Sequence, residues 1–89
     1  MTRPVSRTEI TLKRKDGVET KVYMTPRQEK LFTFLFERLD TPVDVEEVRQ
    51  HMDISLQNLR VTKMQVQLAI EGYYVIMSKW GKSYTMHQL

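Results

Sequence analysis

The stretch of sequence that decides the fold is residues 55–72, SLQNLRVTKMQVQLAIEG. Ser55 favours the start of a helix, because its hydroxyl can accept a hydrogen bond from a free backbone N–H of the first turn. Gly72 favours the end of a helix, because glycine adopts a left-handed backbone conformation at little cost. Together these residues predict a helix from Leu56 to about Glu71.

The predicted helix is apolar on two sides, and a polar stripe separates them. Either side can be buried in the core, and the other is then open to a partner. A strand is the alternative, because residues 64–70 also alternate at period two, but the cap and the glycine stop favour a helix. At 100° per residue, one apolar side consists of Leu59, Val66, Ala69 and Ile70, and the other consists of Val61, Met64 and Leu68. The polar stripe between them consists of Arg60, Lys63 and Gln67.

Two shorter helices are predicted before this one, and each follows a capping residue. Residues 26–39 form the first, because Thr25 is a good cap, a proline fills the first helical position and a glutamine completes a capping box. Residues 45–52 form the second, because Asp44 and Glu47 have the capping-box spacing and apolar residues recur on one face. The chain therefore has three helices in succession.

A β-hairpin is predicted at each end of the chain. Residues 8–23 alternate apolar and polar side chains around Asp16-Gly17, a pair typical of tight hairpin turns. Residues 73–78 and 83–88 are the strands of the second hairpin, joined by a Lys-Trp-Gly-Lys loop. The expected fold is α+β, in the order hairpin, three helices, hairpin.

The length of 89 residues allows one domain, and residues 1–89 are expected to form it, with residues 1–7 flexible. There is no cysteine, so disulfides and thiolate metal sites are excluded. The N-terminal residues lack the apolar core of a secretory signal, and the longest apolar run, residues 73–77, is too short to cross a bilayer. We therefore expect a cytoplasmic protein without a membrane partner.

The net charge of +3 is distributed unevenly along the chain. Residues 1–30 carry eight Lys/Arg and four Asp/Glu, residues 37–53 carry two and six, and residues 54–89 carry four and one. An acidic middle between two basic ends predicts one surface that faces a polyanion and another that faces away from it. An ordinary, mildly basic surface is the alternative.

Three motifs of these segments recur together in one known family. They are Asp-Gly (16–17) with VYMTPRQ (22–28), VDVEEV (43–48), and Gly-Tyr (72–73) with GKSYTM (81–86). In order and spacing, over roughly residues 9–86, the chain resembles the winged-helix output domain of OmpR/PhoB-type response regulators. The resemblance implies a winged helix-turn-helix. Its third helix enters the major groove, and the C-terminal hairpin is a wing beside the minor groove or the backbone.

The resemblance also implies which positions face DNA. The family's recognition helix falls on residues 57–64, which places its DNA-facing positions on Arg60, Thr62 and Lys63. The basic position of the family's wing falls at residues 79–80. The chain departs from the family in lacking a receiver domain, in the shorter connection before its third helix, and in a serine at the second wing glycine.

The side chains at these positions suit a nucleic acid. Arg60 and Lys63 can neutralise phosphates or reach guanine edges. Trp80 can wedge against a sugar or stack on an unpaired base, or it can fold back on its own hairpin. The candidate nucleic-acid-binding residues are Gln57, Asn58, Arg60, Thr62, Lys63, Gln67, Lys79, Trp80 and Lys82.

These features predict a small transcriptional regulator that binds double-stranded DNA with its third helix and wing. The alternative is a winged-helix interaction module that docks on a larger nucleic-acid machine as inhibitor or adaptor. The exposed apolar stripe of the third helix would then receive a protein partner, or a second copy in a homodimer. No catalytic constellation or cofactor motif is evident, and His51 and His87 lack the neighbours of a metal site. We expect no enzyme activity, cofactor or metal.

Overall fold

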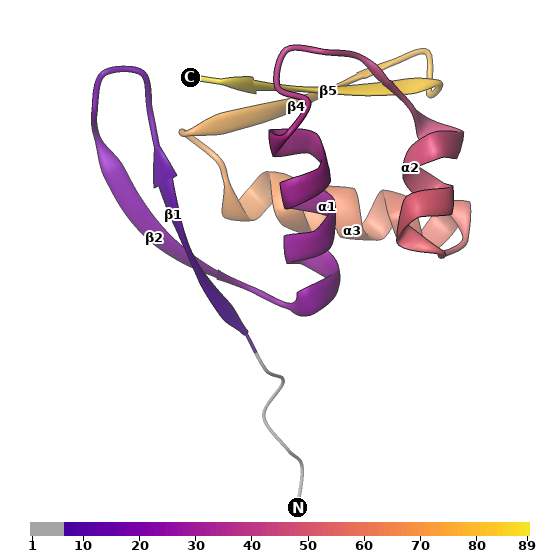
Figure 1. Cartoon of the computed structure of the whole chain (residues 1–89), viewed down its shortest axis with the longest axis horizontal. Helices are drawn as coiled ribbons and strands as arrows, with labels where there is room; N and C mark the ends of the chain where they lie inside the picture. Colours follow the sequence, from indigo (N-terminus) through magenta and orange to yellow (C-terminus); the bar gives the residue numbers. More distant parts are fainter. Residues whose placement is uncertain (1–6) are drawn as a thin grey trace, which may run out of the picture.

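The chain folds into three helices and two antiparallel sheets, with a β-hairpin at each end (Figure 1). The computed structural model describes residues 7–89, so all but the last of residues 1–7, expected to be flexible, lie outside the described residues. This α+β architecture is consistent with a winged-helix arrangement and confirms the predicted fold class. The elements are β1 (Thr8–Lys13), β2 (Glu19–Met24), α1 (Pro26–Phe36), β3 (Val43–Asp44), α2 (Val45–Met52), α3 (Leu56–Ala69), β4 (Tyr74–Lys79) and β5 (Ser83–Gln88).

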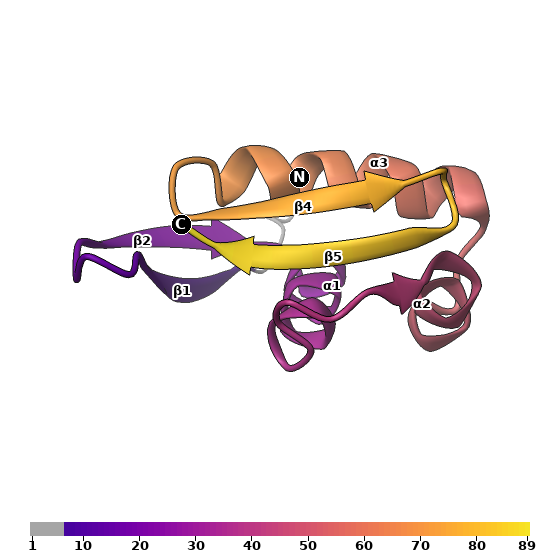
Figure 2. The same cartoon turned by 90° about the horizontal axis from the view of Figure 1, so that it is seen from above.

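The second sheet, in the order β3-β5-β4, covers the helices from one side (Figure 1). Seen from above in Figure 2, β4 lies next to α3, and β5 lies next to α1 and α2. The β1–β2 hairpin forms a separate sheet. It is joined to the end of the chain because the Lys15 N–H donates to the Leu89 carbonyl at 2.7 Å. The β4–β5 hairpin lies beside α3, in the position of a wing.

The helices begin as the sequence predicts and end earlier. The capping box of α1 is complete, since the Gln28 N–H donates to Thr25 Oγ1 at 3.3 Å and the Thr25 N–H donates to Gln28 Oε1 at 3.1 Å. Helix α1 stops at Phe36 rather than residue 39. The chain turns there toward the sheet, where the Asp40 N–H donates to the Met86 carbonyl at 2.8 Å. The predicted capping box of α2 is wrong in detail: Asp44 accepts from the Glu46 N–H at 2.8 Å rather than pairing with Glu47.

Residues 64–70 are helical through Ala69, so the alternative strand is excluded. The helix ends two residues before Glu71, because the N–H groups of Tyr73 and Tyr74 both donate to the Ile70 carbonyl at 3.0 Å. The chain reverses at Gly72, whose φ of +87° lies in the region that favours glycine.

The structure also decides which apolar side of α3 belongs to the core. Leu59, Val66 and Ile70 are fully buried, and Ala69 packs against them. On the opposite side, Val61, Met64 and Leu68 are 49%, 65% and 67% exposed. The buried side is covered by α1, β2 and β4, so the helix presents a second, uncovered apolar stripe to solvent.

The core joins one face of each hairpin to the inner faces of the helices. Burial of these side chains is the main stabilising contribution in a domain of this size. Within residues 7–89, no helix is long and apolar enough to cross a membrane. The buried apolar residues are Leu12, Met24, Leu31, Phe32, Phe34, Leu35, Val43, Val45, Val48, Met52, Leu59, Val66, Ile70, Tyr74, Ile76, Tyr84 and Met86.

Candidate nucleic-acid interface

Helix α3 and the β4–β5 hairpin enclose a groove of about 400 Å³. The helix contributes predicted site residues to one wall, and the hairpin forms the other wall. Tyr84, which the sequence assigns to packing, lines the groove although its side chain is 4% exposed. The residues that line the groove are Leu56, Arg60, Lys63, Met64, Gln67, Ser78, Gly81 and Tyr84.

Sequence reasoning missed the hairpin side of this groove. Ser78 and Tyr84 pair across the hairpin, and both contribute to the groove wall that faces α3. The alternation of residues 83–88 predicts that Tyr84 shares a face with Met86. It does not predict that the edge of this face opens onto α3. That contact depends on how β4 lies against the helix.

Arg60 and Lys63 of α3 line the groove, and Lys79 and Lys82 flank the adjoining turn of the hairpin. Among residues 7–89, none of the four lies within 4.0 Å of a carboxylate oxygen. Unneutralised cations that line one concave surface raise the local concentration of anions. The groove is therefore suited to a polyanion.

Lys63 and Arg60 also act on the tyrosine of the groove wall. The Lys63 Nζ lies 5.5 Å from the centroid of the Tyr84 ring, within the range of a cation–π interaction. Burial raises the pKa of the Tyr84 phenol, and the charge of Arg60 acts in the opposite direction. Tyr84 therefore stays a neutral hydrogen-bonding group at physiological pH, and Lys63 is held over the groove rather than free in solvent.

The turn between β4 and β5 carries the most exposed large hydrophobic residue of the described chain, Trp80, at 84%. The alternative in which Trp80 folds back on its own hairpin is therefore excluded. The Lys82 N–H donates to the Lys79 carbonyl at 2.9 Å, and the two residues between them have positive φ, +56° at Trp80 and +63° at Gly81. Two successive positive φ angles under this hydrogen bond are typical of a type I′ turn, here within a three-residue loop because Lys79 pairs with Ser83. Asparagine or glycine usually occupies the first of these positions.

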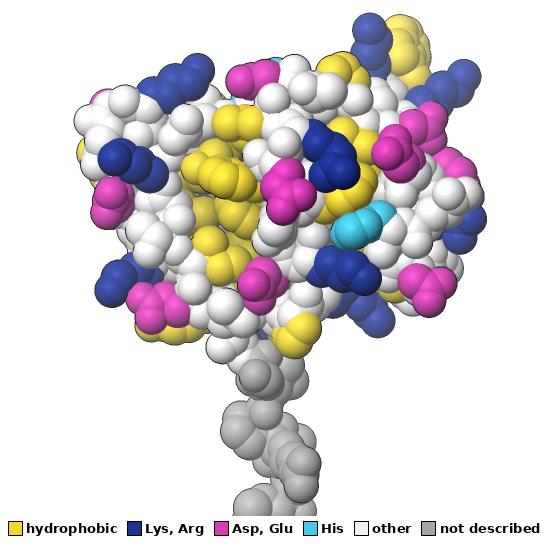
Figure 3. Space-filling model, in the orientation of Figure 1, with side chains coloured by type: hydrophobic (Ala, Val, Ile, Leu, Met, Phe, Trp, Pro, Cys, Tyr) yellow, Lys and Arg dark blue, Asp and Glu magenta, His cyan; other side chains and the backbone are white. Residues whose placement is uncertain are grey.

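A bulky side chain in a left-handed conformation is unfavourable, by about 1–3 kcal/mol. The other two positive-φ residues that are not glycine are Asp40 and Asp53, and aspartate tolerates this conformation. Trp80 is the exception, and its indole is also exposed to water. In Figure 3 the β4–β5 turn projects at the upper right as a hydrophobic group beside Lys/Arg side chains.

One predicted contact residue is wrong. Thr62 is 2% exposed, and its hydroxyl donates to the Asn58 carbonyl at 2.8 Å. Thr62 lies on the buried side of α3 together with Leu59 and Val66, so it cannot reach a ligand. The sequence contained this signal, because the helical period places residue 62 between residues 59 and 66 on one face.

The other predicted residues are accessible to different degrees. Gln57 and Asn58 are exposed in the first turn of α3, where the Asn58 N–H is already bonded to Ser55 Oγ at 3.2 Å. Gln67 is half-buried in the groove wall. Lys79 and Lys82 are exposed on either side of the turn. Eight of the nine candidate positions thus remain available to a ligand.

The acidic middle of the chain does not face away from this surface as predicted. Asp44, Glu46 and Lys82 line a second, smaller groove of about 240 Å³ between the start of α2 and the turn of the wing. The Val45 N–H donates to the Lys82 carbonyl at 2.7 Å and holds the two segments together. Glu46 is partly neutralised by Arg49, whose hydrogen bond lowers the pKa of the Glu46 carboxyl.

The carboxylates in the first turn of α2 limit where DNA can contact the protein. In a helix-turn-helix, the helix before the recognition helix crosses the DNA backbone. Carboxylates in the first turn of α2 repel phosphates there. The surface that remains favourable to a polyanion is the side of α3 that faces the wing.

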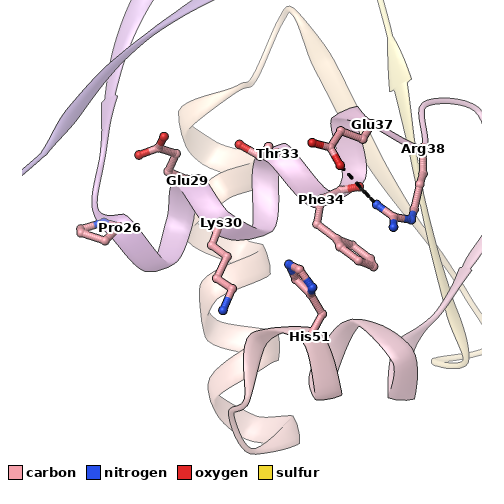
Figure 4. Close-up of a pocket in the computed structure, with 8 residues that line it drawn as sticks. All are labelled: Pro26, Glu29, Lys30, Thr33, Phe34, Glu37, Arg38 and His51. Carbon is pink, nitrogen blue, oxygen red and sulfur yellow. Dashed lines mark hydrogen bonds and ion pairs between the residues drawn. The ribbon is translucent and has the colours of Figure 1, made fainter.

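Another groove, of about 420 Å³, lies between α1 and α2 (Figure 4). Its aromatic floor is Phe34, whose ring lies 4.3 Å from the His51 ring centroid and 3.8 Å from the Arg38 guanidinium carbon. The molecule's own side chains thus cover this ring. The rim carries Glu29 and Glu37 as well as cations, so it has no single charge preference. In the described part of the chain, no three His, Cys, Asp or Glu side chains form a group that could hold a metal ion.

Comparison with known protein families finds no family model that matches the chain, and no curated protein matches it. The class that the structure defines is accordingly an α+β fold consistent with a winged helix. Its activity has to be argued from the site itself.

Proposed function

We propose that this protein is a cytoplasmic DNA-binding regulator of transcription, similar in role to the output domain of OmpR/PhoB-type response regulators. In this role α3 and the β4–β5 wing hold double-stranded DNA. The observation that carries the proposal is that Arg60 and Lys63 in the groove, and Lys79 and Lys82 at the adjoining turn, have no carboxylate oxygen within 4.0 Å among residues 7–89. The wing in its place beside α3 supports the same role.

The site offers two kinds of contact, one to phosphates and one to base edges. The wing lysines and the α3 cations bind phosphates, which positions the protein on the duplex without reading its sequence. The amides of Gln57, Asn58 and Gln67 have the donor and acceptor pairs that recognise base edges.

This mode predicts a salt dependence that follows from the number of phosphate contacts. For four contacts, the logarithm of the association constant should fall with the logarithm of salt concentration at a slope of about −3.6. A protein that binds through an apolar surface would show little dependence on salt. The slope on random duplex DNA is therefore the primary measurement.

A second candidate function is that of a protein-interaction module on a larger nucleic-acid machine. Two observations favour it. Met64 and Leu68 are two-thirds exposed in the centre of the outer face of α3, and the first turn of α2 is acidic. An exposed apolar stripe of this kind is typical of a surface that is covered in a complex.

One experiment with two double variants separates the candidates. Arg60→Ala with Lys63→Ala removes two of the four contacts, so DNA affinity should fall about 30-fold at 0.15 M salt and the slope should drop to about −1.8. Val61→Ser with Leu68→Ser alters the exposed apolar stripe outside the groove and should change DNA affinity by less than about 3-fold. Fluorescence anisotropy with a labelled duplex measures both.

The matched control is Arg27→Ala with Lys30→Ala, which removes the same charge from exposed positions on α1. Its affinity should stay within about 3-fold of the unaltered protein, since these residues lie outside the groove. If both cation variants weaken binding equally, the attraction is nonspecific and the groove is not the site. A flat salt response of the unaltered protein rules out the DNA-binding role and leaves the interaction module.

A further inference from the structure

Trp80 is unfavourably placed in the free protein in two independent respects. It is the only tryptophan of the chain, and 84% of its surface is exposed. Its backbone has a φ of +56°, in a turn position where asparagine would form the same turn without strain. Backbone strain persists where a function requires that side chain at that place. The exposed indole is therefore a candidate contact for a ligand.

The surroundings of Trp80 indicate the chemistry of that ligand. Lys79 and Lys82 flank the indole in the turn, and both are exposed. Lysine is depleted in the centres of protein–protein interfaces, because its hydrated ammonium group is costly to bury. A nucleic acid presents both complements at once: phosphates for the lysines and a flat base for the indole.

The position of the turn limits which base is available. The turn lies at the end of the cationic groove, since Gly81 lines both the groove beside α3 and the smaller groove beside α2. A duplex held in the groove brings its bases to the turn only as paired, stacked edges, which offer no face to an indole. A base that has left the stack, or a step that opens easily, offers that face.

We propose that Trp80 stacks on an unstacked base next to the duplex that α3 and the wing hold. The protein then prefers DNA with an unpaired base or an easily opened step over a uniform duplex. This inference rests on the proposed DNA-binding function and adds a specificity that the cations alone do not supply. Trp80 makes the stacking contact, and the four cations hold the flanking backbone.

The test uses the full chain and three labelled DNAs: a perfect duplex, the same duplex with a single unpaired adenine in its centre, and one strand alone. The affinity for the bulged duplex should exceed that for the perfect duplex by about 5- to 150-fold, the range for one stacked base. It should also exceed the affinity for the single strand, which has no duplex for the groove. Because Trp80 is the only tryptophan, its fluorescence should be quenched by the bulged duplex and hardly by the perfect one.

Two substitutions distinguish stacking from folding. Trp80→Asn should reduce the affinity for the bulged duplex to that for the perfect duplex while leaving the latter within about 2-fold, and the variant folds well because asparagine suits the turn. Trp80→Phe keeps an aromatic face in the same strained turn, so it should retain part of the preference. Equal losses on both duplexes, or an asparagine variant that keeps the preference, would overturn the proposal.

The remaining outcomes separate this inference from the function on which it rests. Salt-dependent binding of the perfect duplex without any preference for the bulge removes the stacking role and leaves the proposed function in place. The absence of salt-dependent binding to all three DNAs removes both. A shift of Trp80 emission with protein concentration alone shows that a second copy covers the indole, which also overturns the proposal.

Discussion

The two hairpins of this small fold place similar residues in turns of opposite character. In the first turn, Arg14 pairs with Asp16 at 2.8 Å and the left-handed position is a glycine, Gly17, with a φ of +90°. In the second turn, neither lysine has a carboxylate oxygen of residues 7–89 within 4.0 Å, and a left-handed position is a tryptophan. The first turn therefore contains an ion pair and has glycine at its left-handed position, whereas the second has no ion pair with the described residues and is strained.

The difference extends along the strands. Lys13 pairs with Glu19 and Lys21 with Glu9, so the β1–β2 sheet neutralises its own cations. Asp16 also closes its turn by accepting from the Val18 N–H at 3.1 Å. A basic run in the sequence is therefore not by itself a binding surface. What matters is whether the fold brings a carboxylate to each cation.

The largest expected effect comes from removing the unpaired charges of the second hairpin. Lys79→Ala with Lys82→Ala should reduce affinity for duplex DNA about 30-fold at 0.15 M salt and lower the salt slope by about 1.8, because two phosphate contacts are lost. Lys13→Ala with Lys21→Ala removes the same charge from paired cations and should change affinity by less than about 3-fold. Anisotropy titrations at several salt concentrations measure both. Equal effects would mean that the hairpins are equivalent and that net charge alone drives binding.

A smaller effect separates the two turns by their backbone strain. Gly17→Ala should destabilise the fold by about 1 kcal/mol, since alanine at positive φ is strained, even though the added Cβ has open space. Trp80→Asn should stabilise the fold by about 1 kcal/mol, because it relieves strain in the same type of conformation. Melting temperatures should move in opposite directions, by about 4–8 °C each. A Trp80→Asn variant that melts lower than the unaltered protein would show that the indole stabilises the fold.

The smallest expected effect is a pH dependence of stability that comes from the ion pair of the first turn. The hydrogen bond from Arg14, followed by that from the Val18 N–H, lowers the pKa of Asp16 below its ordinary value of 3.8. A carboxyl whose pKa is lowered by folding stabilises the protein above its unfolded pKa, and this stabilisation is lost as the pH falls through its folded pKa. The melting temperature of Asp16→Asn should therefore lie slightly below that of the unaltered protein near neutral pH. The gap should close in acid, as the pH falls through the lowered pKa of Asp16. A gap that is the same at both pH values would show that the Asp16 charge does not act in the turn.

Much of the fold could be predicted because its signals are local. Thr25, Asp44 and Ser55 each cap a helix where the sequence places one, since capping involves only residues two or three positions apart. Gly17 and Gly72 mark reversals for the same reason, because their backbone preference needs no distant contact. The ends of α1 and α3 were less predictable, since hydrogen bonds from the sheet and from the following strand decide them.

The candidate site was predictable in its residues and not in its arrangement. Arg60 and Lys63 could be assigned to one stripe of α3 from the helical period alone. The sequence could not show that Ser78 and Tyr84 face them across a groove, because that contact joins elements 15 or more residues apart. The acidic start of α2 and the wing are also far apart in the sequence. The hydrogen bond from the Val45 N–H to the Lys82 carbonyl brings them together in the fold.

The sequence by itself determined the order of the elements, their starting residues and the stripe pattern of α3, since each depends on neighbours within one or two helical turns. Only the tertiary structure decided which apolar stripe of α3 is core. Both stripes satisfy the helical period equally, and the choice was made when α1, β2 and β4 packed against Leu59 and Val66. The same packing buried Thr62 and left the cations without carboxylates, because the position of a side chain relative to distant elements is not encoded in its local pattern.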